Sequence, residues 1–500
     1  ENSHIVVNNN EVIDAISGNT VSITDSYVKA KSTEHTVSSI SSKNGITISG
    51  SQVLAEIGKA FEEKDVIQNV DSSNSVITKQ WKDADTNETV TKTYVYGKAT
   101  LKEDLTIASG ESIEFESGAR ITNPEKLTLV DGASLLVNGE AHTHNKDGDV
   151  TYTWKDDNNH IKNVACKDCP IGYVTTEMET HSIGENGFCA CDNVYQPAEL
   201  TTDKYDIDGD DSKDAVYEIS NAGQLYWFAE LVNGTLEIVS QNTSANAVLT
   251  NDITINTNVL NEDGTLNTND ADKFRTWMPI GFCYDINHDD LPEIVYYKGL
   301  FDGNGHTISG LYLNNKEQRD VGLFGKISEE AEIRNVGVIN SYFYGDYRIG
   351  GICGSNFGTI INSYNSSIVK SDDIAIGGVC GANFGTITNS YNSGNISSSS
   401  RYVGGVCGVN EESGKITNSY NSGSLSGNED VGGVCGYNLN MITNCYYDQD
   451  KYSGNGVGKN SGEAIGKTTA EFKKGKISYF LSLGENGSIW GQSIGIDDYP

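Results

Sequence analysis

The sequence predicts an all-β protein built around a parallel β-helix, and three observations point to this fold class. Four near-copies of one motif follow one another, beginning at Gly350, Gly377, Gly404 and Gly432. A cysteine occupies the same place in each copy, and successive cysteines lie 27, 27 and 28 residues apart. The copies are rich in Gly, Thr and Asn and lack the 3.6-residue period of helical repeats. Because a propeller blade needs about 40 residues, one β-helix coil per copy is the repeat that remains.

The composition limits the classes of partner. Asp and Glu number 69 against 35 Lys and Arg, which gives a formal charge of −34. Such a chain repels phosphate backbones and anionic bilayers, so we expect no nucleic-acid partner. No run of 18 apolar residues occurs, so we also expect no membrane insertion. Because Glu1 is not a native start, the chain is expected to be part of a longer protein.

Residues 1–140 are expected to form an N-terminal, solenoid-like region of short strands. The stretch DLTIASGESIEFESGARITNPEKLTLVDGASLLVNG alternates apolar and polar residues, and Gly or Asn-Pro interrupts it about every 8 to 12 residues. One helix is predicted in this region, with Ser51 as its N-cap. The apolar residues Val53, Ile57 and Phe61 follow at a spacing of four, which is typical of a helix face.

Histidine and cysteine concentrate in residues 141–196, a small module that we expect to bind zinc. Its eight candidate ligands are His142, His144, His160, His181, Cys166, Cys169, Cys189 and Cys191. The two cysteine pairs are near zinc-ribbon spacing, although the second is Cys-x-Cys rather than Cys-x-x-Cys. These ligands suit one four-cysteine site or two mixed sites of structural zinc. Two disulfides in an oxidising location, or free thiols, are the alternatives.

Residues 197–340 are expected to contain a capping helix and the first β-helix coils. The stretch SNAGQLYWFAELVNG is amphipathic, Ser220 can cap its start, and Gly234 can end it. A helix before a run of strands can cover the open end of a solenoid, where unpaired strand edges need a partner.

Residues 341–450 hold the repeats, and residues 451–500 are expected to form the C-terminal cap. Thr468 and Glu471 have the spacing of a capping box. Four apolar residues could then face the last coil: Phe472, Ile477, Phe480 and Leu481. A solenoid requires such a cap at its end.

Stacked coils place equivalent side chains about 4.8 Å apart, so identical residues should form files along the β-helix. Two asparagine files are expected to form amide ladders: Asn356, Asn383, Asn410 and Asn438, and Asn362, Asn389, Asn418 and Asn444. The file of Cys353, Cys380, Cys407 and Cys435 is expected to be buried free thiols. Parallel Cβ atoms nearly 5 Å apart suit a disulfide poorly, since it needs about 3.8 Å.

A tyrosine file offers a candidate ligand surface. Tyr364, Tyr391 and Tyr420 follow the same period, with Tyr446 after them. Exposed rings in a row could stack on sugars, whereas covered rings would form a structural aromatic ladder. Both interpretations are open at the level of sequence.

Two acidic loops have the alternation of calcium-binding loops. In DIDGDDSKDAVYE, the residues Asp206, Asp208, Asp210 and Asp214 match ligand positions one, three, five and nine. The EF-hand glycine and the final glutamate are displaced, so the match is partial. The stretch YDINHDDLPEIVY repeats the pattern, and a solvated acidic turn is the alternative for both.

The quartets that begin at Gly351, Gly378, Gly405 and Gly433 resemble the GLUG motif, as does Gly322-Leu323-Phe324-Gly325 one turn earlier. Together with FDGNGHTISGL and the tail GKTTAEFKKGKISYFL, they resemble large extracellular proteins of anaerobic, gut-type Firmicutes. The resemblance covers roughly residues 216–500. It implies a right-handed β-helix, and such repeats also occur as stalks beside adhesin or protease modules. The zinc-protease signature His-Glu-x-x-His does not occur in the sequence.

The leading expectation is therefore a non-enzymatic protein that is secreted or attached to the cell wall. It would be an adhesin, or the stalk of one, binding a host surface or glycan. A polysaccharide lyase or glycoside hydrolase on the same scaffold is the second hypothesis, because such enzymes use clustered carboxylates. The acidic residues near the repeat corners do not recur in register, which counts against it. A structural spacer in a longer chain is the third.

Overall fold

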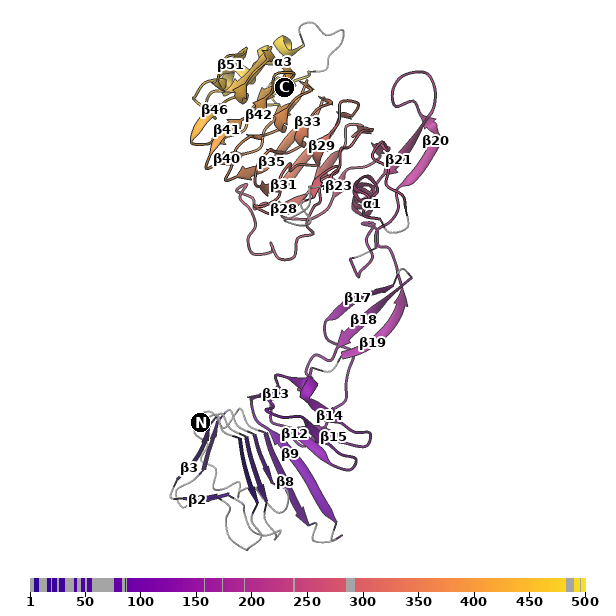
Figure 1. Cartoon of the computed structure of the whole chain (residues 1–500), viewed down its shortest axis with the longest axis vertical. Helices are drawn as coiled ribbons and strands as arrows, with labels where there is room; N and C mark the ends of the chain where they lie inside the picture. Colours follow the sequence, from indigo (N-terminus) through magenta and orange to yellow (C-terminus); the bar gives the residue numbers. More distant parts are fainter. Residues whose placement is uncertain are drawn as a thin grey trace. The chain divides into compact units, whose positions relative to one another are not determined.

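The fold is described from a computed structural model of the chain (Figure 1). The structure describes residues 4–8, 16–18, 20–24, 27–31, 40–42, 46–49, 52–55, 76–82, 86, 88–156, 158–172, 174–192, 194–236, 239–284, 293–482, 490–494 and 496–500. Strands dominate these residues, and the chain divides into two compact units, residues 1–181 and 182–500. The boundary between the units falls inside the expected 141–196 module.

The first unit is a stack of short strands, as the alternating pattern predicts. Its main sheet has the order β1 (His4–Asn8), β4 (Tyr27–Lys31), β7 (Gln52–Ala55), β8 (Val76–Lys82), β9 (Thr89–Val95), β12 (Ser112–Phe115), β15 (Ser134–Val137) and β16 (Glu140–Ala141). Parallel pairs complete the coils: β2 (Ile16–Gly18) with β5 (Ile40–Ser42), β3 (Val21–Thr24) with β6 (Ile46–Ser49), β10 (Lys98–Ala99) with β13 (Arg120–Ile121), and β11 (Leu105–Ile107) with β14 (Leu127–Leu129).

Neighbours in the main sheet are parallel except at two places. Strand β8 pairs antiparallel with β9, and β15 pairs antiparallel with β16. Between β13 and β14 lies one turn of 3-10 helix, Pro124–Lys126. The core of this solenoid is apolar, and side chains such as Ile113 and Phe115 are fully buried in it.

The helix predicted from Ser51 is wrong where the structure describes it. Residues Gln52–Ala55 form strand β7, whose Val53 is fully buried and pairs with Val28 and Ile77. Burial of Val53 between two neighbouring strands favours a strand more than the apolar spacing of four favours a helix. Strand propensity depends mainly on packing against neighbouring strands. The rest of the predicted helix, residues 56–65, lies outside the described residues.

A three-stranded antiparallel sheet follows the solenoid in the first unit. Its strands are β17 (Val150–Asp156), β18 (Asn159–Ala165) and β19 (Val174–Thr180). Most of its side chains are half-buried or exposed, including Trp154 and Met178. Such a sheet buries little apolar surface to stabilise its own fold.

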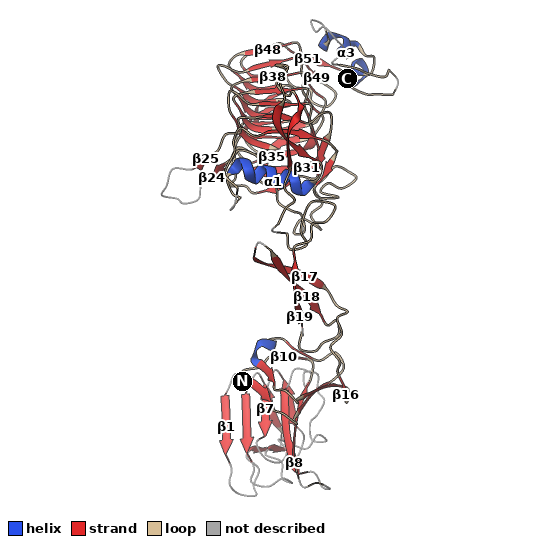
Figure 2. Ribbon diagram, turned by 90° about the vertical axis from the view of Figure 1, so that its right-hand side faces the viewer, coloured by secondary structure: helices blue, strands red, loops and turns tan. Residues whose placement is uncertain are grey.

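The second unit is a parallel β-helix, which confirms the predicted fold class (Figures 1 and 2). One wall has the order β20 (Glu199–Tyr205), β21 (Asp214–Ile219), β22 (Asn246–Leu249), β26 (Leu300–Asp302), β30 (Glu332–Arg334), β34 (Thr359–Ile361), β38 (Thr386–Thr388), β43 (Lys415–Thr417) and β48 (Met441–Thr443). A second wall has the order β29 (Phe324–Ile327), β33 (Cys353–Asn356), β37 (Cys380–Asn383), β42 (Cys407–Asn410), β47 (Cys435–Asn438) and β50 (Val457–Lys459).

The remaining strands complete the coils of this unit. A third wall has the order β23 (Ile253–Thr254), β27 (Thr307–Ser309), β31 (Gly337–Gly345), β35 (Tyr364–Ser371), β39 (Tyr391–Asn392), β44 (Tyr420–Asn421), β49 (Cys445–Asp448) and β51 (Ala464–Lys467), joined by β28 (Tyr312–Asn314), β40 (Ile396–Ser398) and β45 (Leu425–Ser426). A short wall holds β32 (Ile349–Gly350), β36 (Ile376–Gly377), β41 (Arg401–Gly404) and β46 (Glu429–Gly432). Strand β24 (Cys283–Tyr284) pairs antiparallel with β25 (Glu293–Ile294).

The cysteine file is a column of buried thiols, as predicted. Cys353, Cys380, Cys407 and Cys435 pair in register, and each is fully buried and free. Phe324 occupies the equivalent place one coil earlier. The Cys407 thiol donates to the carbonyl of Val409 at 3.1 Å, and burial raises its pKa well above the usual range. The file therefore fills an apolar slot.

Asparagine ladders hold successive coils together. Within the first predicted file, each Nδ2 donates to the Oδ1 of the next coil: Asn356 to Asn383 at 2.7 Å, Asn383 to Asn410 at 2.8 Å, and Asn410 to Asn438 at 2.8 Å. A parallel ladder that the sequence analysis did not identify joins Asn365, Asn392 and Asn421. The sequence pattern that indicates this ladder is an asparagine directly after each of Tyr364, Tyr391 and Tyr420.

The second predicted asparagine file has a conformational role. Asn362, Asn389, Asn418 and Asn444 all have φ near +50°, in the left-handed region. Asparagine tolerates this region better than other residues with a side chain, because its short amide can hydrogen-bond locally. The file therefore marks the corner at which each coil turns from one wall to the next.

Helices cover both ends of the β-helix (Figure 2). Helix α1 (Ala222–Asn233) buries almost all its residues on the first coils and ends at Gly234, as predicted. Its N-cap is Asn221 rather than Ser220, because the Asn221 Oδ1 accepts from the Gln224 amide at 3.0 Å.

At the other end the capping box of Thr468 and Glu471 is confirmed, and it starts helix α2 (Thr469–Phe472). A second helix, α3 (Lys476–Leu481), follows, and both bury apolar side chains.

Candidate metal centre

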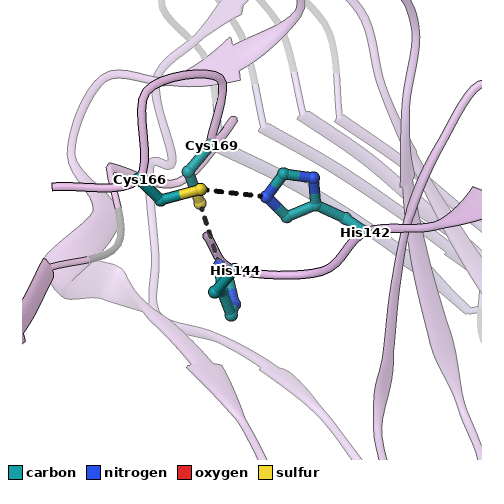
Figure 3. A group of neighbouring side chains, drawn as sticks. All are labelled: His142, His144, Cys166 and Cys169. Carbon is teal, nitrogen blue, oxygen red and sulfur yellow. Dashed lines mark hydrogen bonds between the residues drawn. The ribbon is translucent and has the colours of Figure 1, made fainter. Parts of the chain in front are cut away.

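Four of the eight predicted ligands converge within the first unit (Figure 3). His142 and His144 follow β16, while Cys166 and Cys169 follow β18. The antiparallel turn from β15 to β16 lets the His142 amide bond the Leu135 carbonyl at 2.9 Å. The Cys169 amide donates to the Cys166 carbonyl at 3.2 Å, which folds the cysteine pair into a tight turn. One ligand atom from each residue lies within 4.8 Å of the others.

The distances within this quartet fit a tetrahedral metal site. The Cys166 Sγ lies 3.5 Å from the His142 Nε2, and the Cys169 Sγ lies 3.4 Å from the His144 Nδ1. In a tetrahedron with Zn–S about 2.3 Å and Zn–N about 2.0–2.1 Å, sulfur and nitrogen lie about 3.6 Å apart. The two imidazoles meet edge to face at 5.1 Å, so both rings can direct a nitrogen inward. The quartet can therefore hold a metal ion.

The pKa shift of His144 also favours metal binding. Burial lowers the pKa of His144, and repulsion from His142 lowers it further. A neutral imidazole keeps the lone pair that a metal needs. Cys166 carries a free thiol, from which a metal-binding thiolate can form.

The other four predicted ligands are divided between the two units. In the first unit, the buried His160 on β18 meets the His181 ring edge to face at 5.3 Å. In the second unit, Cys189 and Cys191 are both buried, and their Sγ atoms lie within 4.8 Å of each other. Each pair is thus preformed within its own unit.

The acidic loop before β21 brings together three of its four predicted ligands. Carboxylate oxygens of Asp206, Asp208 and Asp210 lie within 4.8 Å of one another. Asp214 does not join them, because its carboxylate accepts from the Ile207 amide at 2.7 Å. Most of the second acidic loop, residues 285–292, lies outside the described residues.

The tyrosine file is a structural ladder at its C-terminal end. The rings of Tyr364, Tyr391 and Tyr420 stack in parallel at 4.8 and 4.9 Å. Tyr420 is only 1% exposed beneath Trp490 and Phe472, and its hydroxyl donates to the Pro500 carbonyl at 2.8 Å. The interpretation of Tyr420 as a sugar-stacking residue is therefore wrong. Tyr364 and Tyr391 are half-buried.

A groove in the second unit was not identified from the sequence. It has a volume of about 490 Å³, and a smaller hollow of about 330 Å³ shares four of its residues. Its lining includes two amides, an aromatic ring and charged groups: Asn186, Asn256, Phe274, Lys273 and Asp272. These residues belong to loops with no repeat period, so the sequence offered no signal for them.

Comparisons with known proteins cover small parts of the chain. No family model matches it. Halomucin of Haloquadratum walsbyi is 32% identical over 111 residues, which is 21% of this chain and 1% of halomucin. A "Putative Gly-rich membrane protein" of Evansella cellulosilytica is 30% identical over 89 residues, 17% of this chain and 9% of that protein. The chain thus spans under a tenth of either curated relative.

A solved structure also resembles the chain. It is described as a "putative immunoglobulin A1 protease" from Bacteroides ovatus, and it is 18% identical. The match covers 60% of this chain and 93% of that one, with a TM-score of 0.35. A likeness of that size carries no statement about activity. Among the described residues, no helix is long and apolar enough to cross a membrane.

Proposed function

We propose that this chain is a non-enzymatic part of a secreted or surface-attached protein, in which the β-helix serves as an adhesin or its stalk. The observation that carries the proposal is that the repeated cysteines and asparagines pack the interior of the β-helix. The thiol file and the asparagine ladders fill the interior, coil after coil, between Cys353 and Asn438. A repeat of this kind builds a long, stable rod that can display loops.

The acidic residues near the corners support a scaffold rather than a polysaccharide-cleaving site. Asp346 pairs with Arg319 at 3.1 Å, and Asp372 accepts a hydrogen bond from the Tyr344 hydroxyl. Asp320 is buried and forms an ion pair with Lys326 at 2.8 Å. Carboxylates that are paired in this way stabilise the coil, whereas a lyase or hydrolase needs a carboxylate pair facing a sugar.

The resemblance to GLUG-type surface proteins and the naming of one curated relative as a membrane protein both favour an extracellular location. Glycans are the ligand class we propose, and the groove is where we expect them. Amides and charged groups can bond sugar hydroxyls, while the Phe274 ring offers an apolar face.

We also propose zinc for the quartet of His142, His144, Cys166 and Cys169, since two thiolates and two imidazoles are the donor set that tetrahedral zinc prefers. Calcium is the ion we propose for Asp206, Asp208 and Asp210, because it binds carboxylate oxygens. Both ions would be structural.

The test is a glycan array screened with the full chain, followed by turnover assays on any glycan that binds and on acidic polysaccharides. Binding that the double variant Lys273→Ala/Phe274→Ala abolishes would support the groove. The matched control is Tyr479→Ala, which removes an exposed ring on α3. Release of shortened products would overturn the non-enzymatic assignment. Absence of binding to every glycan and to mucin would leave the spacer hypothesis.

A further inference from the structure

The last coil of the N-terminal solenoid, formed by β13, β14 and β15, has an end that other residues must cover. An uncovered solenoid end exposes apolar side chains and unpaired backbone groups. Two short segments lie on this end. Strand β16 pairs antiparallel with β15 through Ala141 and Glu140. The loop after Cys169 supplies the Pro170 carbonyl, which accepts a hydrogen bond from the Ile121 amide at 3.0 Å.

The same loop also covers the core. Ile171, directly after Pro170, packs against the buried apolar cluster of the solenoid that includes Leu105 and Ile121. The Gly172 amide donates to the Cys169 carbonyl at 3.2 Å, and Gly172 has a φ of +62°, so Cys169–Gly172 form a tight turn. The capping part of the loop therefore includes Pro170 and Ile171, directly after the candidate ligand Cys169.

Each of the two capping segments ends at a pair of ligands. His142 and His144 follow β16 without a gap, and Cys166 and Cys169 come directly before Pro170. The quartet thus joins the segment on the β15 edge to the segment on the β13 edge. A bound ion would hold the two at a fixed separation.

The adjoining three-stranded sheet buries too few apolar side chains to hold the two capping segments together by packing alone. Val164 and His160 are the buried residues on strands β17 to β19, among those whose side chains the structure describes. Four large apolar side chains on these strands are exposed instead: Val150, Trp154, Val174 and Met178. Small modules with so little core usually depend on a metal or disulfides.

We propose that the ion bound by His142, His144, Cys166 and Cys169 locks the end cap of the N-terminal solenoid. The inference rests on the zinc site proposed above and adds what the zinc does. The C-terminal β-helix offers the contrast, because Phe472, Ile477, Leu481 and Trp490 form its cap by apolar packing. Removal of zinc should therefore loosen the end cap of the N-terminal solenoid and leave the C-terminal cap of the β-helix intact.

The experiment measures zinc content and backbone amide exchange on the full chain, before and after chelation. We expect at least one zinc per chain. Chelation should speed exchange in peptides containing Ile121 about tenfold or more, as for a segment that opens locally. Peptides around Cys407 should not change, and added zinc should restore protection at Ile121. Because this arm uses the wild-type chain, it does not depend on the folding of a variant.

Two variants separate this inference from the zinc site itself. Cys166→Ser/Cys169→Ser should lose zinc and the protection of Ile121. The matched control Val150→Ser/Met178→Ser changes two exposed side chains of the adjoining sheet and should keep both the zinc and the protection of Ile121. A wild-type chain without zinc would overturn both proposals. Bound zinc with unchanged exchange at Ile121 after chelation would overturn the cap alone, as would loss of protection in the control variant.

Discussion

The Ile121 amide donates to the Pro170 carbonyl across 49 positions of sequence, at a distance of 3.0 Å. This bond joins the edge of the last N-terminal coil to the loop that carries Cys166 and Cys169. It places the cysteine pair beside the end of the solenoid as well as in the candidate metal site. Fold and candidate chemistry therefore depend on the same few residues.

The close packing of coils at the first glycine of each Gly-x-Cys-Gly quartet should make Gly378→Ala strongly destabilising. A Cβ at Gly378 would lie 2.2 Å from the Asn392 Cγ and 2.3 Å from the Gly405 carbonyl oxygen. We expect the free energy of unfolding of the β-helix to fall by about 1–3 kcal/mol or more. Urea unfolding followed by circular dichroism measures it. Gly491→Ala is the control, because a Cβ there meets nothing within 4 Å; equal stability of the two variants would contradict the prediction.

Removal of one side chain from the first asparagine ladder should lower the free energy of unfolding of the β-helix. Asn383→Ala removes the acceptor of Asn356 and the donor to Asn410, and all three side chains are buried. Buried groups left without partners cost about 1–3 kcal/mol each, so we expect a loss of about 2 kcal/mol or more. The same urea titration tests this. The exposed Asn395, changed to Ala, should leave the midpoint where it is, and a similar shift in both variants would argue against the ladder.

The C-terminal cap should loosen in acid. The Thr468 amide donates to the Glu471 carboxylate at 3.0 Å, and this bond is the main reason that the pKa of Glu471 lies below its usual 4.5. A lowered carboxyl pKa adds stability that is fully present above about pH 4.5 and is lost as the pH falls through the folded value. Amide exchange at Phe472, corrected for intrinsic rates, should therefore increase below that pH.

The variant Glu471→Gln is the control for the acid response. Glutamine can still accept from the Thr468 amide, since a capping box accommodates either residue, but it does not titrate. Protection of Phe472 in this variant should vary less with pH than in the wild type. An identical pH profile in both proteins would mean that Glu471 is not the responsive group.

The thiol file should be inert in the folded protein. Cys353, Cys380, Cys407 and Cys435 are fully buried, and alkylation requires an accessible thiolate. Iodoacetamide should leave all four unmodified under native conditions and modify all four in guanidinium, as peptide mass spectrometry will show. Native labelling, or disulfide-linked peptides from this file, would refute the packing role.

The repeat period determined most of the second unit in advance. Cysteine spacings of 27 and 28 residues are one coil each, and the Phe324–Cys353 pairing extends the register to the quartet before them. The period predicted which residues share a file, because in-register coils place identical side chains on top of one another. It did not predict that Asn362 and its equivalents occupy left-handed corners.

Local patterns were less reliable where the first unit has no exact repeat. The sequence around Val53 fits a helix as well as it fits a strand. Only the pairing of Val53 with Val28 and Ile77 shows that it belongs to a strand. The exposure of Tyr420 could not be judged from its file. It depends on Trp490 and Pro500, which return to the file from as many as 80 residues away.

The sequence by itself determined the coil length, the residue files and the eight candidate ligands, because these follow from composition and spacing along the chain. The tertiary structure alone decided which side chains meet. His142 and His144 join Cys166 and Cys169 because β15 turns back into β16 and β18 ends beside them. Such meetings depend on long-range strand pairing, which no local spacing encodes.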